Sequence, residues 1–150
     1  MSLRRTRVLN APIEDVWRVI EDAYQMPRWW PQVERVEGVD ADRFTQVFVS
    51  TRRRTVRADF RLVASEPPDA GGRRGHRTWA QELKGTPFER VLQESVTEVT
   101  VEPASEGGTR VTLGQRHKLK GSSRLGVLPM RRATGKRLDQ ALDGLVRILG

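Results

Sequence analysis

Two polar side chains that could take part in chemistry lie in a stretch of alternating apolar and polar residues at 109–119. Gln115 and His117 share a side there with Val111, the side expected to face the interior. His117 is placed to titrate on an inward face, and Arg77 to anchor a carboxylate or phenolate. Both are therefore candidate catalytic residues. The competing interpretation of His117 is a structural or exposed histidine, because the sequence places no carboxylate or serine beside it. The competing interpretation of Arg77 is a charged residue near a strand end that reaches water.

Other polar and aromatic side chains share these inward faces. A buried polar group without a partner costs about 1–3 kcal/mol, so this inventory favours a wet or ligand-filled cavity over a plain core. The alternative is that a strand is out of phase by one residue, for example at a β-bulge, and that these side chains face solvent. The expected cavity lining comprises Trp29, Trp30, Phe60, Trp79, Gln81, Gln93, Gln115, His117, Met130, Leu138 and Leu142.

The elements that must position these residues follow from periodicity. A short strand is expected at 4–9, then a helix whose apolar face repeats at helical spacing from Ile13, with Asn10 as cap and Pro12 in the first turn. Prolines on both sides of the tryptophan pair in "MPRWWPQV" (26–33) leave room for a second short helix or a bend.

Period-two alternation then predicts about six antiparallel strands between residues 33 and 119. Turn-forming stretches at 50–54, 67–75, 84–87 and 103–108 separate them. A long amphipathic helix is expected at about 129–149, and it is the one element long enough to cover the apolar face of such a sheet. The sequence thus predicts an α+β fold: a curved antiparallel sheet of about seven strands around a long C-terminal helix, with two short helices after the first strand.

Composition narrows the function classes. The 150 residues have the usual size of one domain, taken as 1–150, and the lack of long apolar runs or a secretion signal predicts a cytoplasmic protein. The chain has no cysteine, which excludes thiol chemistry, and only two histidines, which are too few for a multi-histidine metal site. We therefore expect neither a metal nor a cofactor.

The net charge of +8 is regional rather than uniform. Arginines cluster at 52–61 but alternate there with Asp59, as on a solvated sheet face, and no recognition motif accompanies them, so we expect no specific nucleic-acid partner. The basic stretch at 116–137 is compatible with a weak contact with an anionic membrane.

These features resemble the SRPBCC superfamily, the helix-grip fold of START domains and pollen-allergen-like proteins, and within it the polyketide cyclase/dehydrase branch. The matching residues are Ala11-Pro12, Val16-Trp17, Asp22 and Trp29-Trp30-Pro31-Gln32-Val33, with "EGGTRVTL" (106–113) and the final helix. The resemblance covers essentially the whole chain and implies a cavity between sheet and long helix. It places Trp29 at a family position, expected to pack in the core, and leaves Trp30 to face the cavity mouth or a neighbouring molecule.

The resemblance specifies fold more than function. The leading expectation is a protein that binds a hydrophobic or amphipathic small molecule, lipid or polyketide-like, as a monomer or homodimer. The alternative is a cyclase, aromatase or dehydratase acting on a polyketide held in the cavity. "GTPF" (85–88) is similar to a turn of those enzymes, whereas "TVRADFRL" (55–62) departs from them, because it carries no tryptophan and turns Arg57 and Arg61 away from the apolar face.

Overall fold

A computed structural model describes residues 1–50, 52–69 and 73–150, without the side chains of 122–124. Residues 51 and 70–72, inside two of the predicted turns, lie outside the described part. In chain order the elements are β1 (Ser2–Leu9), α1 (Ile13–Glu21), the 3-10 helix η1 (Ala23–Gln25), α2 (Met26–Trp29), β2 (Val33–Glu37), β3 (Arg43–Val49), β4 (Thr55–Glu66), β5 (Gly75–Gln81), η2 (Pro87–Arg90), β6 (Leu92–Pro103), β7 (Thr109–Leu119), η3 (Gly121–Gly126) and α3 (Val127–Leu149).

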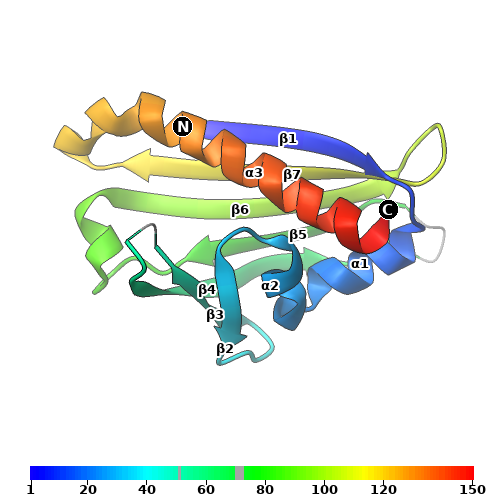
Figure 1. The fold of residues 1–150 in the computed structure, drawn as a ribbon, viewed down its shortest axis with the longest axis horizontal. Helices are drawn as coiled ribbons and strands as arrows, with labels where there is room; N and C mark the ends of the chain where they lie inside the picture. Colours follow the sequence, from blue (N-terminus) through cyan, green and yellow to red (C-terminus); the bar gives the residue numbers. More distant parts are fainter. Residues whose placement is uncertain (51, 70–72) are drawn as a thin grey trace.

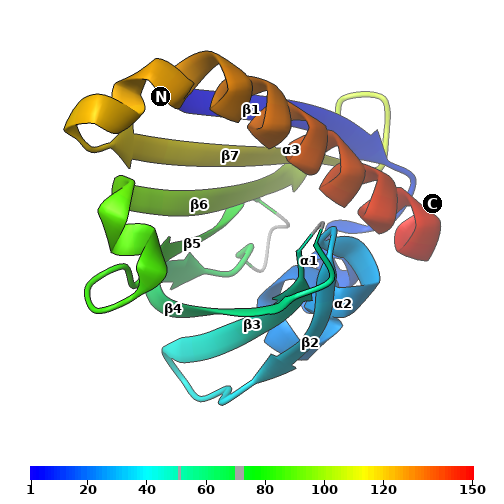
Figure 2. The same ribbon diagram turned by 60° about the vertical axis from the view of Figure 1, so that its left-hand side comes forward.

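The described strands form one antiparallel sheet in the order β1-β7-β6-β5-β4-β3-β2. The strands β2 to β7 follow one another as a meander, and β1 pairs with β7 at the edge, from Ser2 opposite Arg116 to Leu9 opposite Thr109. Figure 1 shows α3 crossing the sheet, and Figure 2 shows the sheet curling around it. The predicted helix-grip architecture is confirmed.

The helix α3 is held to the sheet by a stripe of fully buried side chains. Leu138, Ala141, Leu142 and Leu145 are each 0% exposed, as the helical spacing predicted. A β-carbon on Gly144 would overlap the backbone of Trp29, so a glycine here lets α3 lie directly against α2.

The start of α1 differs from the prediction in its cap. Pro12 occupies the N-cap position and no side chain caps the helix. Asn10 is not the cap; its backbone N–H instead donates to the carbonyl of Gly150 at 2.7 Å. The apolar face is as expected, because Ile13 and Trp17 are buried with the rest of the stripe.

The tryptophan pair lies where helical structure ends. Pro27 does not precede the second helix but occupies its first turn, which tolerates a residue without an N–H donor. The helix ends at Trp29, Trp30 is extended, and Gln32 adopts a left-handed backbone with φ 68°. This bend turns the chain from α2 into β2. In the part of the chain that the structure describes, no helix is long and apolar enough to cross a membrane.

Candidate functional site

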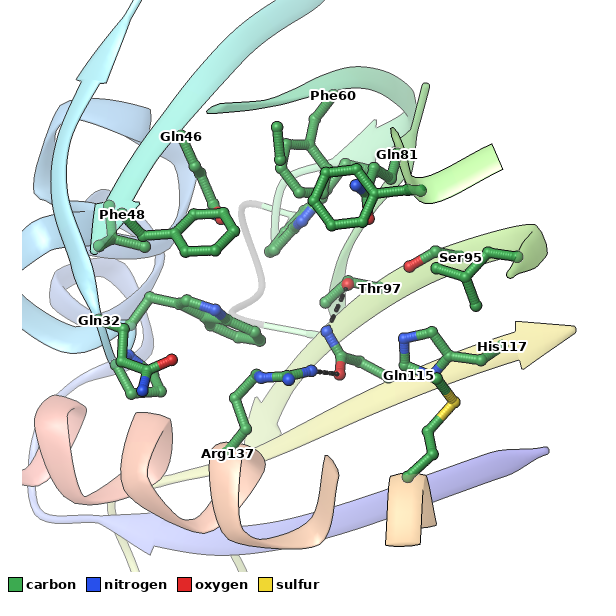
Figure 3. Close-up of a pocket in the computed structure, with 18 of the residues that line it drawn as sticks. Gln32, Gln46, Phe48, Phe60, Gln81, Ser95, Thr97, Gln115, His117 and Arg137 are labelled. Carbon is green, nitrogen blue, oxygen red and sulfur yellow. Dashed lines mark hydrogen bonds between the residues drawn. The ribbon is translucent and has the colours of Figure 1, made fainter. Parts of the chain in front are cut away.

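A cavity of about 300 Å³ lies between the concave side of the sheet and α3 (Figure 3). This volume falls at the lower end of the roughly 300–1,000 Å³ typical of ligand pockets, which favours a compact ligand. Strands β2 to β7 supply most of the lining, and the bend after α2, the segment 88–91 and α3 supply the rest. The lining residues are Trp30, Pro31, Gln32, Val33, Gln46, Phe48, Ala58, Phe60, Trp79, Gln81, Phe88, Val91, Leu92, Ser95, Thr97, Gln115, His117, Met130 and Arg137.

Aromatic rings make up one part of the lining. The ring centroid of Trp30 lies 6.4 Å from that of Trp79 in an edge-to-face arrangement, and Phe60 stacks on Phe44 at 5.2 Å. Trp29 lies behind Trp30 at 5.5 Å. Such contacts hold rings in fixed orientations, so the apolar part of the cavity is formed before a ligand arrives.

A short hydrogen-bond chain joins three of the polar lining residues. Arg137 from α3 donates to the amide oxygen of Gln115 on β7 at 3.3 Å, and the Gln115 amide nitrogen donates to the hydroxyl of Thr97 on β6 at 3.0 Å (Figure 3). Burial lowers the pKa of Arg137, which nevertheless remains protonated at neutral pH. Arg137 is therefore the one charged side chain among the described lining residues at neutral pH.

His117 is buried beside this chain, with 6% of its surface exposed. Its Nδ1 atom has no hydrogen-bond partner in the described structure. Burial, reinforced by the positive charges of Arg137 and of the Met1 amino group, lowers the pKa of His117 from 6.5 to about 4. His117 is thus neutral at pH 7. Since an efficient general base has a pKa near the working pH, it is better suited to hydrogen bonding than to proton abstraction.

The structure brings seven of the expected residues together at the cavity: Trp30, Phe60, Trp79, Gln81, Gln115, His117 and Met130. Three others lie in the core behind it: Trp29 is 1% exposed, and Leu138 and Leu142 are 0% exposed. They support the wall and are not among the side chains that line it.

Gln93 corrects the expected phase of β6. The ladder between β6 and β7 shifts register between Leu92 and Glu94, so Leu92 lines the cavity and Gln93 is exposed on the outer side. The bulge explains the error, because an extra residue exchanges the two faces of a strand.

Arg77 does not line the cavity either. It lies on β5 opposite Ser65, whose hydroxyl accepts a hydrogen bond from its guanidinium at 2.8 Å. The side chain borders a separate hollow next to Glu21 and Tyr24, at the end of the sheet that α1 and η1 cover. Burial lowers the pKa of Arg77, and the charge of Glu21 opposes this.

Sequence reasoning missed Arg137 as a lining residue. The signal was present, because Met130 and Arg137 are seven residues apart and so share a helix face. Gln46 and Phe48 on β3 were also missed; they face the cavity because they pair with Ala58 and Val56 on β4. Among the described residues, no group of three or more histidines, aspartates and glutamates could hold a metal ion.

Solved structures with the same fold cover nearly the whole chain. The protein DR_A0006 of Deinococcus radiodurans is 22% identical, with a TM-score of 0.65 over 99% of this chain and 95% of that one. A START superfamily protein of Mycobacterium smegmatis is 9% identical, with a TM-score of 0.72 over 99% and 96%. The di-domain aromatase/cyclase BexL of the BE-7585A biosynthetic pathway is 20% identical, with a TM-score of 0.74 over 98% of this chain and 45% of that one.

These likenesses establish the fold, and no curated protein matches the sequence. A family model described as polyketide cyclase/dehydrase and lipid transport matches residues 1–150. The match spans both the tryptophan bend and the strands that line the cavity. The chain therefore belongs to the polyketide cyclase/dehydrase and lipid transport family.

Proposed function

We propose that the protein holds a compact amphipathic small molecule, lipid-like or polyketide-like, in the cavity between the sheet and α3. The observation that carries this function is the lining itself, in which five aromatic side chains occur together with the polar side chains of Gln115, His117 and Arg137. A solid core rarely retains so many polar side chains, and the His117 Nδ1 atom lacks a partner in the described structure. The family description supports the same class of ligand.

Filling the cavity from within tests this function. Ala58 lines the cavity, whereas Ala80 faces an outer hollow on the other side of the sheet. In calorimetric titrations with the neutral aromatic probe 2-naphthamide, we expect Ala58→Phe to weaken binding at least about tenfold and Ala80→Phe to leave it unchanged. Equal binding by both variants would place the probe outside the cavity. Mass spectrometry under native and denaturing conditions then identifies the natural ligand.

Cyclisation or dehydration of a polyketide is the second candidate function. It is favoured by one observation, the presence of a titratable group, His117, among the cavity-lining side chains. The low pKa of His117 and the distance of Arg77 from the lining weigh against it. We expect a linear poly-β-ketone thioester to bind without turnover. If turnover occurs, its loss in His117→Asn assigns the histidine to the reaction, and its survival in both His117→Asn and Arg77→Gln removes both residues from it.

The segment where η3 passes into α3 offers a contact for an anionic membrane surface. Leu125 and Leu128 are 94% and 78% exposed, and Arg131 and Arg132 on α3 are exposed beside them. No acidic residue occurs between residues 116 and 138. Basic residues around exposed leucines suit a bilayer interface, from which an amphipathic ligand reaches the cavity rim at Val91.

Vesicle sedimentation checks this contact. We expect binding to phosphatidylserine vesicles at low salt, with loss of binding in the double variant Leu125→Ser/Leu128→Ser. Val63→Ser, which removes a residue 56% exposed on β4, is the matched control. Equal binding to neutral vesicles would contradict the electrostatic part of the argument.

We expect no specific nucleic-acid partner for this protein, which we infer to be cytoplasmic and a monomer or homodimer. The arginines of the outer sheet face support the first point, because acidic neighbours pair with them. Arg57 contacts Glu37 at 2.6 Å, and Arg116 contacts Glu94 at 2.9 Å. Such pairs leave fewer charges free for phosphates.

A further inference from the structure

The cavity contains a cation without a matching anion. No aspartate or glutamate is among the described lining residues, and the one charged side chain there is Arg137. Its single hydrogen bond in the described structure goes to the neutral amide oxygen of Gln115. A guanidinium has five N–H donors, so most of the donors of Arg137 have no protein acceptor in the described structure.

Acidic residues of the same helix point elsewhere. Asp139 pairs with Arg5 at 3.4 Å and Asp143 pairs with Arg7 at 2.8 Å, both across the outer contact between α3 and β1. Arg137 lies on another face of α3 and has no ion pair among the described residues. Half-buried charges are costly unless they are paired, so the partner of Arg137 is to be sought in a ligand.

The neighbours of Arg137 hold it for such a ligand. Gln115 accepts from Arg137 and donates to Thr97, so both ends of its amide are committed and its oxygen is fixed toward the guanidinium. Figure 3 shows Arg137 reaching from α3 toward Gln115, with His117 next along β7. An arginine held in this way presents a planar fork, which matches the geometry of a carboxylate.

We propose that the ligand is an amphipathic organic monoanion whose carboxylate pairs with Arg137, while its apolar body lies against Trp30, Trp79 and Phe60. This inference rests on the proposed binding function and adds the chemical class of the ligand. A long neutral lipid or a neutral polyketide does not supply the charge that the site lacks. The aromatic side of the cavity accounts for the body of the ligand, and the Arg137–Gln115–Thr97 chain accounts for its head.

A matched pair of probes separates charge from shape. 2-Naphthoate and 2-naphthamide have nearly the same size and ring system, but only the first is an anion at pH 7.5. In calorimetric titrations we expect the wild-type protein to bind the naphthoate at least about tenfold more tightly than the amide. We expect Arg137→Gln to abolish this preference by weakening the binding of the naphthoate at least about tenfold.

Two further variants control for net charge and for folding. Arg132→Gln removes the same charge from an exposed position on α3 and should keep the full preference. Arg137→Lys keeps the charge but loses the planar fork, so an intermediate preference is expected. Thermal unfolding of each variant establishes that it is folded before binding is measured.

The possible outcomes distinguish this inference from the function on which it rests. If wild-type protein binds both probes equally, or if Arg132→Gln loses the preference as Arg137→Gln does, the carboxylate proposal is overturned and cavity binding stands. If neither probe binds at millimolar concentration, the cavity does not accept a compact aromatic ligand and both proposals fail. A preference that disappears in Arg137→Gln, is reduced in Arg137→Lys and persists in Arg132→Gln supports both.

Discussion

Replacing His117 with asparagine should remove a pH dependence from the stability of the protein. Folding lowers the pKa of this histidine from 6.5 to about 4, so the unfolded chain binds a proton more readily than the folded one. Between these two values, falling pH favours unfolding, and above about pH 6.5 the effect vanishes because both states are neutral. The linkage relation gives a loss of about 2.5 kcal/mol between about pH 7.5 and pH 4.5 from this residue alone.

Urea unfolding at the two pH values measures this loss. For a domain of this size it corresponds to a fall in the unfolding midpoint of about 1 M. Carboxylates also titrate in this range, but they do so in both proteins, so the difference between wild type and His117→Asn isolates the histidine. The variant His76→Asn, at the other histidine, is the matched control because His76 does not line the cavity. If His117→Asn shows the same loss on acidification as wild type, the reasoning about its burial is refuted.

Three other predictions concern Arg137, the helix contact and the tryptophan pair. Arg137→Met should leave the free energy of unfolding unchanged or raise it by about 1 kcal/mol or more in urea titrations, because the variant buries no unpaired charge. A decrease of about 1 kcal/mol would show that the Arg137 side chain stabilises the fold. Gly144→Ala should cost about 1–3 kcal/mol because its β-carbon meets the backbone of Trp29, whereas the β-carbon of Gly135→Ala meets side-chain atoms of Arg5 and Leu3 and should cost less in the same assay. Trp29→Ala should cost about 3–5 kcal/mol as a core deletion, whereas Trp30→Ala should cost less and weaken probe binding; the opposite order would exchange the roles of the two rings.

The fold was predictable because its signals are long and regular. Alternation such as that of Ala58 and Phe60 against Asp59 persists over whole strands, and the leucine stripe of α3 extends over three turns. A long helix beside a one-sided sheet has few ways to bury both apolar faces, so the topology followed as well. Helix caps are local features that the periodic patterns do not determine, and the prediction of Asn10 as a cap was wrong for this reason.

The site was predictable only where strand phase continued without interruption. Trp79, Gln115 and His117 lie on uninterrupted stretches and face the cavity as expected. Gln93 does not, because a bulge changes the phase at a position that no residue type marks. Arg77 lies on the expected face of β5, but at a position along the strand where it borders the hollow next to Glu21 rather than the cavity. The alternation of faces does not specify this position. Pairing register and bulges depend on tertiary packing, which a single sequence does not display.

The electrostatics of the cavity favour ligand binding over catalysis as the function of this site. The charge of Arg137 is one cause of the low pKa of His117, so a site that attracts an anion is also a site that keeps its histidine neutral. A general base that abstracts protons near pH 7 requires the reverse arrangement, in which a carboxylate stabilises the imidazolium. The neutral imidazole with its unpartnered Nδ1 is available as a hydrogen-bonding group. The same two residues therefore favour recognition of an acidic ligand and disfavour proton transfer from it.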